Sequence, residues 1–261
     1  MRLTLASLGR RMARWFARVG ALARFCFEAF ASYRTMPGAG RRVSGRVLAN
    51  QLRFTALEGV GLVVLLSCVL SFLVISSAIR QLGQLGATDL IGKLMVVVIV
   101  RELGPLLTAL AVAGRSGTAI AAELATNTVM GEVRALEAIG IEPFHYLVLP
   151  RLAGSIGSVM MLIVVFDGVA ILSGLVAAGA NGMSAERYFS GVLSTLTTVD
   201  LAASMFKGAV FGAVIGLLPS FQGLTVKQDP TEIPRAVIRA TVGVIAMIFV
   251  IAAIFVLVAG G

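Results

Sequence analysis

Residues 90–113 read LIGKLMVVVIVRELGPLLTALAVA, a run that is long and apolar enough to cross a lipid bilayer. Arg101, Glu102 and Pro105 lie near its midpoint. An Arg at the centre of a membrane helix costs roughly 2.5 to 3.5 kcal/mol on insertion scales, so charged residues at that depth usually serve a function. The run therefore predicts a membrane-spanning helix that carries a functional polar position.

The composition extends this prediction to the whole chain. Of the 261 residues, 58% are hydrophobic and 13% are charged, which is too apolar for a soluble domain. A spanning helix needs about 20 mostly apolar residues, and barrel strands would be short and half polar. Five stretches qualify, at 60–79, 90–113, 152–178, 201–224 and 236–258. We therefore predict an all-α integral membrane protein with five transmembrane helices.

The basic residues indicate the orientation of these helices. The net charge is +9, and 11 of the 22 Lys and Arg residues lie in residues 1–53. With a cytoplasmic N-terminus, the inside segments hold 17 of the 22 and the outside loops hold Arg80, Lys93 and Arg187. The positive-inside rule then places the N-terminus in the cytoplasm and the C-terminus outside. We expect this charge to set topology rather than to bind nucleic acid.

The basic arm, residues 1–53, precedes a membrane domain that covers residues 54–261. Apolar residues and Arg residues of the arm fall on opposite sides of a helical wheel, which favours a helix lying in the headgroup region over a basic tail with accidental periodicity. Within the membrane domain, the most polar stretch is a loop at about 115–150, between the second and third spans.

A short helix is expected inside that loop, at 129–139. Glu132 and Leu136 share one i,i+4 row, Glu137 lies beside them, and Gly140 provides a common helix end. Pro143 prevents the helix from continuing. A short amphipathic helix in a cytoplasmic loop is what a permease needs to receive force from a soluble motor protein.

Arg101 and Glu102 are the candidate substrate-binding residues. Neighbours on a helix point about 100° apart, so the two side chains must address different partners unless Gly104 and Pro105 break the helix. This favours a polar pocket over a simple internal ion pair.

For the other polar residues of the spans, the sequence makes less specific predictions. Asp167 either lines a polar path or pairs inside the bundle. Asp200 and Lys207 lie shallow enough for a structural role in which the side chains reach toward the headgroups. Glu123 is expected to brace Arg115 or the loop helix.

The sequence gives little indication of a nucleotide-binding or metal-binding motif. The string GATDLIGKL, residues 86–94, has the wrong spacing for a phosphate-binding loop and a Leu where Ser or Thr is required, so any ATP must be bound by another chain. The single His145 has no second His or Cys nearby to complete a metal site, and no cofactor is expected.

Several ordered strings carry a family resemblance. RELGP, AGRSGTAIAAEL, ALEAIG and YLVLPR follow one another between Arg101 and Arg151, and the stretch resembles the MlaE-family permease subunit of MCE-type ABC phospholipid transporters. A weaker likeness extends over about 51–241, with DLAASMFKGAVFG in the fourth span and RAVIRATV at the start of the fifth.

The resemblance implies a homodimer in the bacterial inner membrane, a multi-pass protein with a cytoplasmic N-terminus and a periplasmic C-terminus. Its expected partners are cytoplasmic ABC ATPase subunits, a periplasmic ring of MCE-domain proteins and, as an optional addition, a small STAS-type regulatory subunit. The expected cargo is phospholipid, and the expected role is outer-membrane lipid asymmetry. The resemblance assigns Arg101 and Glu102 to the lipid cavity, and Glu132, Arg134, Glu137 and Gly140 to the ATPase-coupling helix.

Two other functions stay open from the sequence. An ion-coupled secondary transporter or channel would use Glu102 and Asp167 as coupling sites and would need no ATPase. A membrane enzyme would need clustered His, Asp or Ser-His groups, and the chain has one His. We therefore expect a non-catalytic permease subunit.

Overall fold

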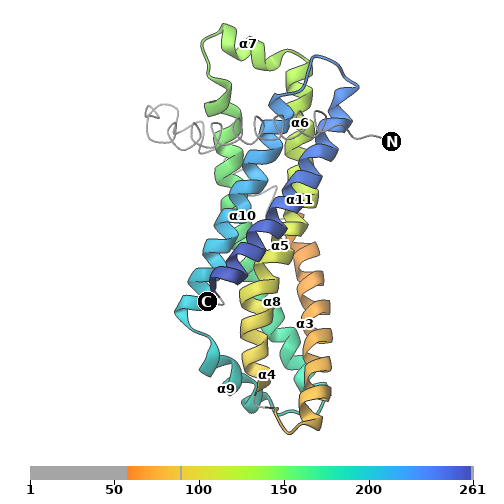
Figure 1. Cartoon of the computed structure of the whole chain (residues 1–261), viewed down its shortest axis with the longest axis vertical. Coiled ribbons are helices and arrows are strands. Elements are labelled where there is room, and N and C mark those ends of the chain that lie inside the picture. The colour runs from red at the N-terminus through yellow and green to blue at the C-terminus, as the bar shows by residue number, and fades with distance from the viewer. Residues whose placement is uncertain (1–57, 89, 260–261) are drawn as a thin grey trace, which may run out of the picture.

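A computed structural model describes residues 58–88 and 90–259 of the chain. The basic arm and the interfacial helix expected in it lie outside the described residues. Every regular element in the described part is a helix, and five helical segments are long and apolar enough to cross a membrane (Figure 1). The all-α prediction with five transmembrane helices is confirmed.

The spans are longer than the apolar runs that predicted them. The first is α3 (Glu58–Gln84), the third is α8 (Leu149–Ala180), the fourth is α10 (Thr198–Leu224) and the fifth is α11 (Glu232–Ala259). The second crosses as a chain of shorter elements: α4 (Leu90–Leu94), η2 (Met95–Leu103), α5 (Gly104–Val112), η3 (Ala113–Gly117) and α6 (Thr118–Val129).

The second span is continuous over Leu90–Val129, so Gly104 and Pro105 do not break it. Instead, η2 and η3 are π-helical, and the Gly104 N–H donates to the Ile99 carbonyl, five residues back. Pro105 lies in the first turn of α5, where a missing N–H is tolerated. Wider π turns are frequent at functional sites, and Arg101 and Glu102 lie in the last turn of η2.

Shorter helices close the two ends of the bundle. At one end lie α7 (Glu132–Ala138) and η4 (Phe144–Val148), which connect α6 to α8, together with the link between α10 and α11 (Figure 1). At the other end, α9 (Ala185–Thr195) joins α8 to α10 and packs on α4. The sequence analysis did not predict α9.

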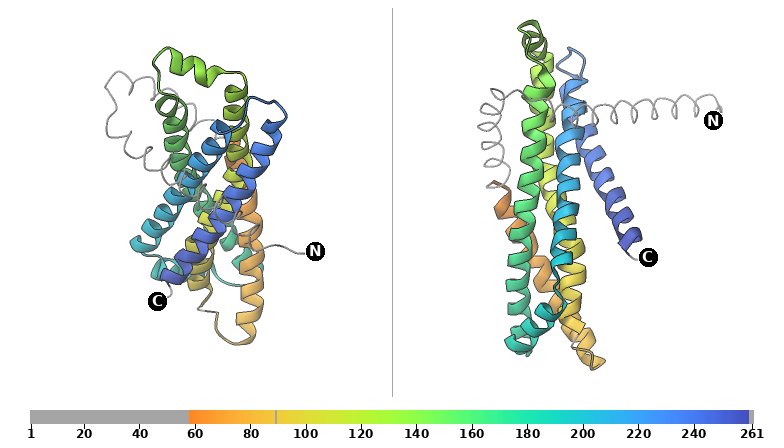
Figure 2. Two further views of the ribbon diagram at one scale, coloured as in Figure 1. Left: turned by 45° about the horizontal axis from the view of Figure 1, so that its top comes forward. Right: turned by 90° about the vertical axis from the view of Figure 1, so that its left-hand side faces the viewer.

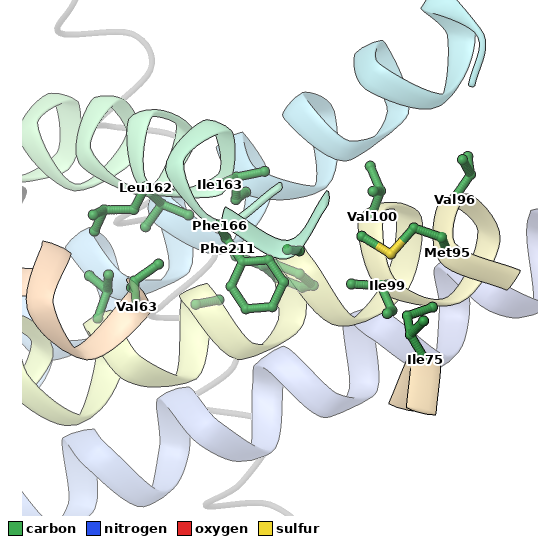
Figure 3. Packing of buried hydrophobic residues seen from close by; sticks show 14 of the residues in the cluster. Val63, Ile75, Met95, Val96, Ile99, Val100, Leu162, Ile163, Phe166 and Phe211 are labelled. Carbon is green, nitrogen blue, oxygen red and sulfur yellow. The ribbon is translucent and has the colours of Figure 1, made fainter. Parts of the chain in front are cut away.

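The core lies where α8 contacts α3, α5 and α10. Phe166, Phe211, Ile99 and Leu162 are among its fully buried side chains (Figure 3). Hydroxyl groups join the helices at close range: Ser67 and Ser71 of α3 donate to the carbonyls of Phe166 and Ala170, both at 2.6 Å. Such bonds between small polar residues suit helices that must associate without a hydrophobic driving force.

The fifth span packs least tightly. Only 11% of the most apolar stretch of α11 is buried, against 33–50% in the other four spans. Its C-terminal half diverges from the bundle, as Figure 2 shows from the side. After Arg239, the exposed side chains of this helix are apolar, among them Val242, Phe249 and Leu257.

Candidate functional site

The structure joins three spans through charged and aromatic groups near the predicted polar position. Lys207 Nζ of α10 lies 2.6 Å from Glu102 Oε1 of η2, and the Lys207 residue is only 5% exposed. The same ammonium group lies 5.8 Å from the centre of the Phe255 ring of α11, within range of a cation–π interaction. We call Arg101, Glu102, Asp200 and Lys207 the ionic cluster.

The backbone at Pro105 explains part of this geometry. In an α-helix the N–H of residue 105 would donate to the carbonyl of Arg101, but proline has no N–H. Lys207 Nζ donates to that carbonyl at 3.0 Å. The ammonium therefore has both a carboxylate and a backbone acceptor, which compensates a buried charge for its loss of water.

Arg101 is held more loosely. Its guanidinium lies 3.7 Å from Asp200 Oδ1 and 3.9 Å from Glu102 Oε1, and its side chain is 32% exposed. Asp200 also caps α10, because its carboxylate accepts from the N–H and hydroxyl of Thr197 while the Thr197 hydroxyl accepts from the Asp200 N–H. Arg101 is therefore the cation of the cluster that is best placed to meet an incoming group.

The ionic cluster contains Asp200 and Lys207 in addition to the two residues predicted from the sequence. Arg101 and Glu102 were predicted for a polar pocket, whereas Lys207 was expected to reach toward the headgroups. Lys207 instead lies buried beside Glu102. An intramembrane Lys and an intramembrane Glu on different spans are an electrostatic match, and this was the available signal that the two would meet.

Asp167 of α8 lies beside Gly104, the first residue of α5. The residue is 6% exposed, and its Oδ1 atom has no hydrogen-bond partner in the described chain. A Cβ atom added at Gly104 would lie 2.7 Å from that oxygen, so only glycine fits there without a shift. Because Oδ1 has no partner in the described chain, both predictions for Asp167 stay open: it lines a polar path, or it pairs inside the bundle.

The short loop helix is present as α7, shorter at both ends than the predicted 129–139. It begins after Gly131, with φ of 81°, and the chain turns away again at Gly140, with φ of 77°. Such left-handed backbone favours glycine at both positions. Val133 and Leu136 pack on a small apolar cluster formed by residues of α6 and η4.

The remaining predicted coupling residues face outward on α7. Glu132, Arg134 and Glu137 are exposed, as expected for residues that meet another protein. Glu123 does not brace this helix through an ion pair; its Oε1 lies 2.6 Å from Arg151 of α8. This pair joins the second and third spans directly below α7, and the sequence analysis did not foresee it.

The His, Cys, Asp and Glu residues within 58–88 and 90–259 do not cluster into a metal centre. No group of three or more His, Cys, Asp or Glu residues in this part could hold a metal ion. His145 contacts Glu142 at 2.7 Å, one helical turn away.

The ionic cluster and the α7 end both lie within the part of the chain that matches a known protein family. The family model for "Permease MlaE" matches residues 48–258, which covers all five spans and α7. The chain belongs to the MlaE permease family. The resemblance inferred from the strings between Arg101 and Arg151 is thereby confirmed.

Relatives of this MlaE-family chain include bacterial proteins and a plant protein. A probable ABC transporter permease protein of Rickettsia felis is 27% identical over 90% of each chain. One from Synechocystis is 27% identical over 80% of each chain. Protein TRIGALACTOSYLDIACYLGLYCEROL 1, chloroplastic, of Arabidopsis thaliana is 29% identical over 82% of this chain and 63% of its own length.

These findings establish the general role of the chain. The chain is a multi-pass membrane protein and the permease subunit of an ABC transporter, a non-catalytic role that implies a separate ATPase partner. The α7 end and the ionic cluster are therefore features of a transporter subunit rather than of an enzyme.

Proposed function

We propose that this MlaE-family permease moves phospholipid between the inner membrane and a periplasmic MCE-domain ring, in support of outer-membrane lipid asymmetry. The observation that carries the proposal is the ionic cluster, which holds two cations and two carboxylates inside the transmembrane bundle. A phospholipid offers a phosphate for Arg101 and acyl chains for the surrounding apolar helices. The name of the Arabidopsis thaliana relative contains that of a galactosylated diacylglycerol, which also favours lipid cargo.

The proposed homodimer agrees with the exposure of α11. A helix with apolar side chains around most of its circumference can lie against lipid or against a second copy. Phe255 of α11 contacts Phe206 edge to face, with ring centres 5.9 Å apart, and also lies over Lys207. A second copy placed along α11 would therefore stand next to the ionic cluster.

The proposed orientation follows the distribution of basic residues. With the N-terminus in the cytoplasm, α7 and the link before α11 lie in the cytoplasm, and α9 lies in the periplasm. The ATPase subunits, and a STAS-type subunit where one is present, then bind at the α7 end. The MCE ring binds at the α9 end.

Reconstitution into liposomes tests the proposal. The full chain with its ATPase and MCE partners should move labelled phospholipid only when ATP is hydrolysed, and mass spectrometry of the intact complex should find two permease copies and bound lipid. Glu102→Ala should lower lipid occupancy or transport. Ion-driven transport by the chain alone would favour the secondary-transporter alternative, and full activity of Glu102→Ala would return Glu102 to a purely structural role.

A further inference from the structure

A hollow of about 560 Å³ opens at the α7 end of the bundle, separate from the ionic cluster. Side chains from α6, α7, η4 and α8 line it. It lies directly beneath the loop helix, where a partner that binds α7 can reach it.

The residues that line this hollow provide both apolar and polar surface. Leu136, Ile139 and Tyr146 supply apolar surface, while Glu132 and Asn127 supply polar groups. A long side chain with an apolar stem and a polar tip would match both surfaces.

The charge of the hollow points to a cationic tip. Glu123 and Glu132 contribute two carboxylates to the lining, and Arg151 contributes one cation. Arg151 is committed to Glu123 and to the Leu147 carbonyl, each at 2.6 Å. Within residues 58–88 and 90–259, the Glu132 carboxylate makes no ion pair or hydrogen bond, so this part of the chain supplies no counter-ion for it.

The exposed residues around the hollow indicate that the cationic side chain belongs to a protein. Met130 and Ile139 are 72% and 70% exposed at the aqueous end of the molecule, and Ile141 is also exposed. Apolar side chains gathered outside the membrane mark protein contacts. Residues 118–148 carry four Glu and one Arg, an acidic region in a chain of net charge +9, which complements a basic partner.

We propose that the hollow receives a Lys or Arg side chain of the ATPase subunit, with Glu132 as its counter-ion. The proposal rests on the proposed binding of the ATPase at the α7 end and adds a specific anchoring position. The stem of the incoming side chain lies along Leu136 and Ile139, and its charged tip reaches Glu132 and the Asn127 side chain.

Binding of the purified ATPase subunit to the full chain in nanodiscs tests this. Glu132→Gln should weaken binding about tenfold, because it leaves the partner's cation in the hollow without a counter-ion. Ala135→Phe, which fills the hollow without changing charge, should also weaken binding. Glu186→Gln is the matched control: it removes an equal charge from an exposed residue of α9, at the opposite end of the bundle and outside the lining, and should change binding less than about twofold.

The outcomes separate the two proposals. Absence of any wild-type binding would overturn the proposed α7 docking and the anchoring position with it. Wild-type binding with unchanged affinity in Glu132→Gln and Ala135→Phe would overturn the anchoring position alone. Thermal unfolding of each variant identifies misfolding, and a basic residue of the ATPase whose reversal to Glu restores binding to Glu132→Lys would establish the pair even if Glu132→Gln proved unstable.

Discussion

Lys207 Nζ and Glu102 Oε1 lie 2.6 Å apart and join α10 to η2 inside the transmembrane bundle. Each charge makes the other tolerable in a low-dielectric setting, and removal of one leaves the other uncompensated. The pair is therefore both a structural link and a polar position that a lipid headgroup could disturb.

The pair should show strong energetic coupling. Lys207→Met should destabilise the protein by about 3–5 kcal/mol, because Glu102 loses its nearest cation. The double variant Lys207→Met with Glu102→Gln should recover most of that loss. Reversible unfolding in mixed micelles gives the coupling free energy from the four variants, and additive effects would show that the two side chains do not interact.

Pro105 should control the second acceptor of Lys207. Pro105→Ala supplies an N–H that can bond the Arg101 carbonyl, which Lys207 now contacts at 3.0 Å. We expect the backbone after η2 to become more regular and slower to exchange, and transport to fall because the ammonium loses an acceptor. Hydrogen exchange of residues 101–109 measures the first effect, and faster exchange there would contradict this account.

Apolar runs in the sequence were sufficient to predict the five spans, because a bilayer demands continuous helices of a minimum length. They did not predict that the second span runs to Val129, since its polar end resembles a loop. There Thr118, Thr126 and Thr128 donate their hydroxyls to carbonyls three or four residues back, so these side chains are satisfied within the helix. The position of Lys207 was missed because depth along one helix does not reveal which helix lies beside it.

Gly212 should be required for contact between α8 and α10. An added Cβ would lie 2.6 Å from the Ile156 Cα atom, and backbone cannot yield as a flexible side chain can. Gly212→Ala should therefore cost about 1–3 kcal/mol. Gly168→Ala is the matched control, because nothing lies within 4 Å of its added Cβ; similar melting temperatures for the two variants would refute the close contact.

Tyr188 should make stability sensitive to alkaline pH. It is buried in α9, its hydroxyl donates to the Ile171 carbonyl at 3.1 Å, and burial raises the pKa of its phenol. The folded state thus holds the proton more tightly than the unfolded state, so its contribution is complete below the unfolded pKa of about 10 and is lost as the pH rises above it. Tyr188→Phe should reduce this alkaline loss in pH-dependent melting; an unchanged profile would assign the loss to other groups.

Glu137→Lys should abolish stimulation of the ATPase subunit while the permease stays folded. Glu137 is exposed on α7, so reversal of its charge disturbs few contacts within the chain but opposes a basic partner. Glu186→Lys makes the same change on an exposed residue of α9 at the opposite end and should leave stimulation intact. ATP hydrolysis by the reconstituted complex compares the two variants. Equal stimulation in both would remove Glu137 from the coupling surface, whereas selective loss in Glu137→Lys would place the ATPase at the α7 end.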